Sequence, residues 1–305
     1  GNVQFTQALC DAVLLAGRDI PIIYSSSIQA ESMNEYGSSK RGAEKALLGL
    51  QRETGNPVYI FRLPNVFGKW ARPNYNSVVA TFCHNISRDI PINVDDPGAV
   101  INLVYIDDVV ASFCDVLEGS CPRDPFVDID KVYKISVDQL VRDLRSFKSS
   151  RESLVIPQVG SGFTRALYST YISYMPPERF AYKVPQYGDE RGLFVEMLKT
   201  KNSGQFSFFT ARPGVTRGGH YHHSKTEKFL VISGSARFRF RHILTGEHYE
   251  MSTSGASPAI VETVPGWAHD IKNIGKEELV CMLWANEIFD RDKPDTFQSS
   301  VLDQN

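Results

Sequence analysis

The sequence of 305 residues has no long apolar run and no block of like charge. No apolar stretch approaches the roughly 20 residues that a membrane helix needs, so we expect no insertion into a membrane. Thirty-three Lys and Arg residues stand against 35 Asp and Glu residues, which gives a formal net charge of -2. We expect no binding of nucleic acid, because that binding depends on clustered positive charge.

The chain also lacks a disulfide pattern. Its five cysteines are odd in number, and none of them forms a CxxC pair. We find no pattern typical of a secretory signal peptide. This cysteine usage is typical of a reducing compartment, so we expect a cytoplasmic protein.

Helical and strand-like stretches alternate in the first half of the chain. At 42% hydrophobic residues the chain can fill two cores, so we expect two domains. The alternation is typical of an α/β domain in which helices flank a parallel sheet. The strand-like runs are 21–27, 58–62 and 102–105, and the helical stretches include 38–52, 77–88 and 136–147.

The second half changes to a period of two residues, with turns rich in Gly, Pro, Asn and Ser. In the run 236–242, Phe238 and Phe240 fall on one face and three arginines on the other. The pattern predicts an all-β sandwich or barrel. We therefore expect an α/β domain at 1–178 and an all-β domain at 179–305. The other strand-like runs are 205–210, 229–232, 259–264 and 279–285.

Tyr36 and Lys40 stand four residues apart in the segment YGSSK, so they share one face of the predicted helix. An ammonium group beside a phenol favours the phenolate, which lets the tyrosine give or take a proton near neutral pH. A surface tyrosine beside a solvated lysine is the simpler explanation of an isolated YxxxK. Three serines at 25–27 end a strand-like run just upstream, where a hydroxyl could orient a substrate carbonyl.

Four stretches of this half, in order, resemble the extended short-chain dehydrogenases/reductases that act on nucleotide-sugars. They are YSSSIQA, YGSSK, RLPNVFG and LVYIDDVV. The resemblance implies a Rossmann-like fold in which Tyr36 is the acid/base and Lys40 holds the nicotinamide ribose. It implies that Ser27 polarises the sugar ketone. The residues that match the nucleotide-sugar-binding region of this family are Asn65, Asn74 and Asn76.

One feature of that family is missing from residues 1–305. We find no glycine-rich βα turn of the kind whose amides bind the pyrophosphate of the cofactor. The first residues, GNVQFTQALCDAV, resemble the helix that precedes the serine-bearing strand in the family. We therefore expect the sequence to lack an N-terminal segment, and we expect a chain that begins at Gly1 not to bind NADPH.

The segment GGHYHHSKTEKF, residues 218–229, holds three of the seven histidines of the chain. In an extended segment His220 and His222 point the same way. Glu227 follows after a short turn, and His269 could return to the same place from a later strand. Three imidazoles and a carboxylate suit zinc or another divalent metal, whereas a chance cluster of surface histidines is the alternative.

The spacing of Gly214, His220, His222, Glu227 and Gly234 resembles the first cupin motif, and the segment PGWAHDIKN resembles the second. The resemblance implies that the all-β domain is a cupin barrel.

Two segments, GDERGLFVEM and VTRGGHYH, also resemble the sugar-nucleotide 3,5-epimerases, in which the first histidine is a general base. His220 therefore has two candidate roles, and we favour metal ligand because Glu227 and His269 complete a ligand set. Arg191 and Arg217 would contact an anionic nucleotide-sugar, or else are solvated loop arginines.

A nucleotide-sugar reductase joined to an epimerase-like cupin resembles the bifunctional enzymes of capsular polysaccharide synthesis. The stretches NYNSVVATFCHNI and LYSTYISYMP carry this resemblance as well. It implies a homodimer with zinc in the cupin and NADPH at the reductase. It further implies a UDP-4-keto-6-deoxy-N-acetylhexosamine that is epimerised at C3 and then reduced at C4, on the route to UDP-N-acetyl-L-fucosamine.

Two other functions stay open. The first is an NAD-dependent nucleotide-sugar 4-epimerase or 4,6-dehydratase in which the cupin is only structural. The second is a non-catalytic, metal-stabilised module that binds a sugar.

Overall fold

The computed structural model describes residues 2–119 and 124–302, and the chain divides into two compact units. The first unit is Gly1–Arg145 with Gly160–Pro177, and the second is Ser146–Val159 with Glu178–Asn305. A boundary between independently folding domains at residues 178 and 179 stays a prediction. In the described ranges no helix is both long enough and apolar enough to cross a membrane.

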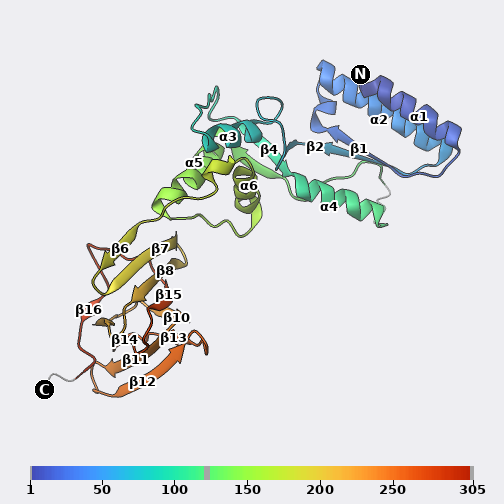
Figure 1. The fold of residues 1–305 in the computed structure, drawn as a ribbon. Coiled ribbons are helices and arrows are strands. Elements are labelled where there is room, and N and C mark those ends of the chain that lie inside the picture. Colours follow the sequence, from blue (N-terminus) through green and yellow to red (C-terminus); the bar gives the residue numbers. More distant parts are fainter. Residues whose placement is uncertain (1, 120–123, 303–305) are drawn as a thin grey trace. The chain divides into compact units, whose positions relative to one another are not determined.

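The first unit is an α/β unit with short sheets (Figure 1). Strand β1 (Ile22–Ser27) pairs in parallel with β2 (Val58–Leu63), and β3 (Asn65–Phe67) pairs in parallel with β4 (Val100–Tyr105). Strand β5 (Tyr133–Ser136) runs antiparallel to β4, which differs from the wholly parallel sheet expected from the alternation. The helices are α1 (Asn2–Ala16), α2 (Glu35–Thr54), α3 (Val78–Ser87), α4 (Ile106–Leu117), α5 (Val137–Ser153) and α6 (Gly162–Ser173), with 3₁₀ turns at Ile28–Glu31 and Pro177–Arg179. Helix α5 belongs to this unit as far as Arg145.

Helix α2 is fixed at both ends and along one face. The Asn34 side chain caps its start by accepting a hydrogen bond from the Gly37 amide at 2.6 Å. Gly55 ends it in the left-handed conformation, with φ of 78°. Leu47 and Leu50 are buried in a cluster with residues of β1 and β2. The helix is therefore held firmly against the strand that ends in the three serines.

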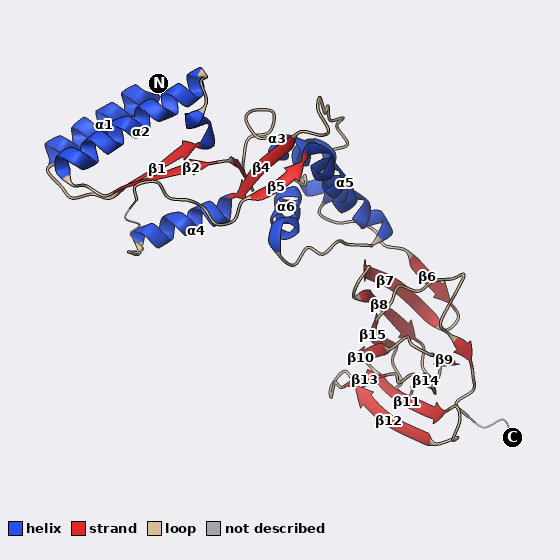
Figure 2. Cartoon of the chain, turned by 180° about the vertical axis from the view of Figure 1, so that it is seen from behind, coloured by secondary structure: helices blue, strands red, loops and turns tan. Residues whose placement is uncertain are grey.

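Apart from the end of α5, from Ser146 onward, the second unit is built from two antiparallel sheets (Figure 2). Their strand orders are β13-β10-β15-β8-β7-β6 and β12-β11-β14-β9-β16. This confirms the all-β unit, although the strands form two sheets and not one closed barrel. The strands are β6 (Gln186–Asp189), β7 (Gly192–Thr200), β8 (Gly204–Ala211), β9 (Thr216–Tyr221), β10 (Glu227–Ser233), β11 (Ser235–His242), β12 (His248–Ser254), β13 (Ile260–Glu262), β14 (Trp267–Asn273), β15 (Leu279–Ala285) and β16 (Phe297–Gln298).

The core of the second unit is contributed by both sheets. Phe209, Phe229 and Leu279 come from the first sheet, and Phe238 and Ile271 come from the second. The alternation predicted for β11 is confirmed, because Phe238 is buried while the arginines beside it are not. The core therefore fixes the distance between the two sheets. It thereby also fixes the positions of the side chains that the sheets present at the end of the core.

Replacement of Leu279 by alanine tests this core. Leu279 is fully buried, so Leu279→Ala should lower the free energy of unfolding of the second unit by about 2–5 kcal/mol. Ile260→Ala on the exposed face of β13 is the matched control and should cost less than about 1 kcal/mol. Urea unfolding followed by near-ultraviolet circular dichroism measures both. Equal losses in the two variants would contradict the assignment of the core.

Candidate functional site

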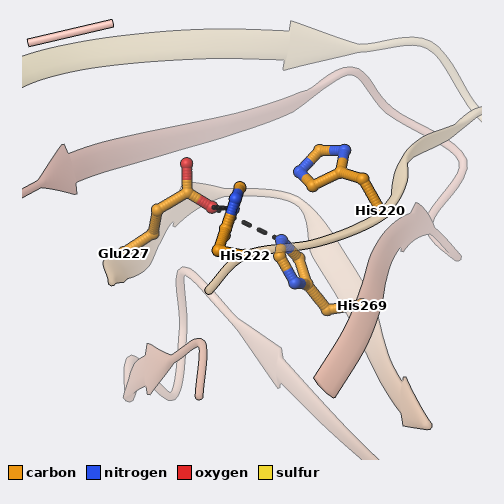
Figure 3. A group of neighbouring side chains, drawn as sticks. All are labelled: His220, His222, Glu227 and His269. Atoms are coloured by element: carbon orange, nitrogen blue, oxygen red, sulfur yellow. Dashed lines mark hydrogen bonds and ion pairs between the residues drawn. The ribbon is translucent and has the colours of Figure 1, made fainter. Parts of the chain in front are cut away.

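Four side chains predicted to bind a metal meet in the second unit, as Figure 3 shows: His220, His222, Glu227 and His269. Each offers one ligand atom, and these atoms all lie within 4.8 Å of one another. Glu227 Oε2 lies 3.1 Å from His222 Nε2 and 3.4 Å from His269 Nε2. The ring centroids of His220 and His269 are 4.7 Å apart. The structure therefore brings together the whole predicted set.

Both sheets contribute to this cluster. His220 in β9 lies directly opposite His269 in β14, and His222 follows β9 by one residue. Glu227 is the first residue of β10, in the other sheet. The expected alternation holds, because the rings of His220 and His222 are neighbours with centroids 5.0 Å apart, whereas His223 is exposed.

The glycine pair before His220 allows this register. Gly218 has φ of 96°, and a Cβ there would lie 2.8 Å from the backbone oxygen of His269. The pairing of β9 with β14 shifts by one residue at this point, between His269 and Asp270. Only glycine combines the left-handed backbone with so close an approach. The GG of GGHYHH thus sets where His220 falls opposite His269.

Asp295 lies 68 residues after Glu227 and binds the histidine segment by hydrogen bonds. It was not predicted from the sequence. Its backbone oxygen accepts a hydrogen bond from His222 Nδ1 at 2.5 Å, which turns Nε2 toward Glu227. Its carboxylate accepts hydrogen bonds from the amides of His223, Ser224 and Lys225 at 2.7–2.9 Å. Burial opposes ionisation, but these amides hold the pKa of Asp295 well below its usual range.

The set fits a divalent metal. His269 Nε2 is buried and has no hydrogen-bond partner, which is unusual for a polar atom unless an ion completes it. Burial opposes ionisation of Glu227, yet the hydrogen bond from His222 and the nearby His269 and Lys225 keep its pKa far below the usual range. Burial, reinforced by the charge of His269, lowers the pKa of His220 to about 4. A carboxylate and a neutral imidazole are the forms that bind metals.

A cavity of about 280 Å³ opens onto the cluster. Arg191 and Arg217 line it together with His220, Glu227 and His269, so both predicted substrate-binding arginines lie at this site. The structure gives each arginine a protein partner as well. The partners are the Asp189 carboxylate, 2.5 Å from Arg191 Nη2, and the Thr210 backbone oxygen, 3.1 Å from Arg217 Nη1.

A second cleft, of about 610 Å³, lies in the first unit. Its lining includes five of the residues singled out in the sequence of this half. Asn74 is not among its lining residues, although Arg72 and Tyr75 are; the backbone of Asn74 has a φ of 54°. The five predicted residues that line the cleft are Ser27, Tyr36, Lys40, Asn65 and Asn76.

Helix α2 carries Tyr36 and Lys40 into this cleft. Lys40 Nζ donates a hydrogen bond to the backbone oxygen of Ser25 at 2.9 Å and lies 5.9 Å from the centre of the Tyr36 ring. Burial lowers the pKa of Lys40, while the nearby Glu44 opposes that shift. Tyr36 is 48% exposed and lines the cleft. The Ser27 hydroxyl accepts a hydrogen bond from the Gln29 amide at 3.2 Å.

A buried hydrogen-bond network next to this cleft was also not predicted from the sequence. The Glu44 carboxylate accepts hydrogen bonds from the Ser26 hydroxyl at 2.5 Å and from Arg62 Nε and Nη2 at 3.0 and 2.7 Å. Arg62 also donates to Glu31. The network joins α2 to the ends of β1 and β2, next to Ser27. Its sequence signal is an acidic residue one turn after Lys40, on the same helix face.

The lowered pKa of His220 predicts a pH dependence for the metal-free second unit. Between pH 6.5 and about 4 the unfolded chain binds a proton that the folded chain excludes, so acidification destabilises the fold. From pH 6.5 to 5 this contribution is about 2 kcal/mol. Urea unfolding at both pH values should show a loss that His220→Gln reduces and the exposed His223→Gln does not. The same loss in all three proteins would contradict the prediction.

Family models match both units. The NAD dependent epimerase/dehydratase family matches residues 2–124, and the polysaccharide biosynthesis C-terminal domain matches residues 187–297. The UDP-2-acetamido-2,6-beta-L-arabino-hexul-4-ose reductase of Pseudomonas aeruginosa is 62% identical over 301 residues, which are 99% of this chain and 81% of that protein.

Solved structures of CapF are also similar. One, of the capsular polysaccharide assembling protein CapF from Staphylococcus aureus, has a TM-score of 0.93 at 40% identity and covers 97% of this chain and 81% of that one. Another, CapF with the inhibitor 3-isopropenyl-tropolone, has a TM-score of 0.88 at 38% identity and covers 97% of this chain and 83% of that one. The chain therefore belongs to the family that includes this Pseudomonas nucleotide-sugar reductase and staphylococcal CapF.

Proposed function

We propose that this protein is a bifunctional nucleotide-sugar enzyme. The second unit epimerises a UDP-4-keto-6-deoxy-N-acetylhexosamine at C3, and the first unit reduces the C4 ketone with NADPH, on the route to UDP-N-acetyl-L-fucosamine. The observation that carries this is the presence of two separate sites, the YxxxK cleft and the cluster of three histidines and a glutamate, in a chain 62% identical to a hexul-4-ose reductase. A homodimer and a cytoplasmic location, both expected from the sequence, are part of the proposal.

The order of the two reactions follows from their chemistry. A ketone at C4 acidifies the proton on C3, so removal of that proton and its return from the other face invert the centre. Reduction of the ketone removes this acidity and fixes the new configuration. Epimerisation therefore precedes reduction on the same substrate.

In the first unit the reduction requires a proton on the C4 oxygen as hydride arrives at the carbon. We assign the proton donor to Tyr36, whose ring is exposed to the cleft and has the Lys40 ammonium beside it. We also assign Ser27 to donate a hydrogen bond to the ketone, and Asn65 and Asn76, which line the cleft, to bind the nucleotide-sugar. Asn74 was predicted for the same role but does not line the cleft. When bound, NADPH supplies the hydride.

In the second unit we assign zinc to His220, His222, Glu227 and His269. A bound divalent metal polarises a substrate oxygen as a Lewis acid. The solved complex of CapF with a tropolone supports this assignment, because tropolones carry two adjacent oxygens that chelate divalent metals. Arg191 and Arg217 would hold the negative charge of the nucleotide-sugar at the mouth of the cavity.

Replacement of Tyr36 tests the reductase. Tyr36→Phe in the natural gene product should lower NADPH-dependent reduction by about a hundredfold or more, because a positioned general acid contributes that much. Incorporation of solvent deuterium at C3 should continue at the rate of the unchanged protein. Tyr182→Phe, an exposed tyrosine of the other unit, is the control. Loss of both activities in Tyr36→Phe would contradict two separate sites.

Replacement of Glu227 tests the cupin. Glu227→Gln keeps the shape of the side chain but removes its charge, so the metal content after dialysis should fall from about one per chain to below about 0.2. Deuterium incorporation at C3 should fall with it, while NADPH oxidation on substrate already epimerised at C3 should persist. Glu262→Gln, an exposed glutamate of β13, should change neither. Full metal content in Glu227→Gln would reject the ligand assignment.

A further inference from the structure

A buried lysine contacts the glutamate of the histidine cluster. Lys225 is 7% exposed and stands in the short turn between His222 and Glu227. Its Nζ is 3.2 Å from Glu227 Oε1 and 5.6 Å from the centre of the Phe289 ring. Lysines are almost never this buried unless they are paired. Lys225 is not among the residues that line the cavity.

The two oxygens of Glu227 therefore have different partners. Oε2 faces His222 Nε2 at 3.1 Å and His269 Nε2 at 3.4 Å, whereas Oε1 faces Lys225. Figure 3 shows the second oxygen turned away from the imidazoles. Only Oε2 is thus available to an ion held by the histidines.

The position of Lys225 is fixed by its backbone. Its amide donates a hydrogen bond to Asp295 Oδ2 at 2.8 Å, and the amide of Ser224 donates to the same oxygen at 2.7 Å. The next residue, Thr226, donates from its amide to the Asn286 side chain at 3.0 Å. Three consecutive amides are therefore tied to the segment that follows β15, which orients the lysine toward Glu227.

The charge of Lys225 changes what the site can bind. A divalent ion with one carboxylate and three neutral imidazoles leaves one positive charge in the cluster. An ammonium group 3.2 Å from that carboxylate offsets the carboxylate charge, so the cluster keeps about two positive charges. Such a site holds the metal less tightly and attracts an anionic oxygen ligand more strongly.

We propose that Lys225 is a positioning residue for Glu227. By binding Oε1, Lys225 keeps Glu227 a one-oxygen ligand, and its positive charge offsets that of the carboxylate. The metal-loaded site therefore favours a ligand with an anionic oxygen. Such a ligand is the enolate formed when a proton leaves the carbon beside a ketone. The inference rests on the metal site of the proposed function.

The two effects of Lys225 predict opposite changes when it is replaced. In metal-free protein Lys225→Met leaves the buried Glu227 carboxylate without its cationic partner, which destabilises the metal-free state and favours metal uptake. We expect the affinity for zinc, titrated into the dialysed full chain against a competing chelator, to rise about tenfold or more. We expect the affinity of the zinc-loaded chain for tropolone, the anionic-oxygen probe, to fall about tenfold.

Two further variants separate charge from folding. Lys225→Gln keeps a hydrogen-bond donor without the charge, so it should shift both affinities in the same directions even if Lys225→Met folds poorly. Lys228→Met removes an exposed lysine on β10 that pairs with Glu262, and it should shift neither. A purely structural lysine would lower stability in the first two variants without raising zinc affinity.

The outcomes distinguish the inference from the function on which it rests. Unchanged or weaker zinc binding in folded Lys225→Gln, beside normal zinc binding in the unchanged chain, would overturn the role of Lys225 alone. An unchanged chain that takes up no zinc would overturn the metal site and the inference with it. Tighter zinc binding together with weaker tropolone binding supports the inference.

Discussion

The carboxylate of Glu227 is the interaction on which the second unit depends. It stands at the start of β10 in one sheet and faces His222 and His269, which belong to the other sheet and the turn beyond it. Its second oxygen is bound by Lys225. A carboxylate buried at this depth is stable only because each oxygen has a partner, so the two sheets, the turn and Asp295 must hold their places together. The metal site is the place where these constraints meet.

The first unit is organised by a similar constraint on helix α2. Tyr36, Lys40 and Glu44 follow one another at intervals of four residues, so they lie along one side of the helix. The first two line the cleft, and Glu44 is buried against Ser26 and Arg62. The helix therefore presents its polar groups at a fixed depth beside the serines of β1. In both units a buried carboxylate anchors the residues that we expect to do the chemistry.

Local periodicity explains which parts of these sites the sequence could predict. The interval between Tyr36 and Lys40 and the alternation of His220 and His222 depend only on helix and strand geometry, and the structure has both.

Asp295 and Arg62 could not be predicted from local periodicity, because they reach the sites from distant segments whose position depends on the packing of the whole unit. Lys225 is a further case, because its amide bonds to Asp295 and its ammonium group lies 5.6 Å from the centre of the Phe289 ring. Asn74 shows the opposite case: a motif placed it near the cleft, but a turn with positive φ takes it out of the lining. The antiparallel β5 was not expected because pairing direction is set by chain topology, which no local pattern records.

The measurement that tests the account most directly is a crystal structure of the zinc-soaked protein with anomalous diffraction recorded on both sides of the zinc absorption edge. The account predicts one strong peak in the second unit, about 2.0–2.2 Å from imidazole nitrogens of the three histidines and from Oε2 of Glu227. Lys225 should still be bound to Oε1. A difference map without a peak among these four side chains, or a peak bound by both oxygens of Glu227 with Lys225 displaced, would contradict it.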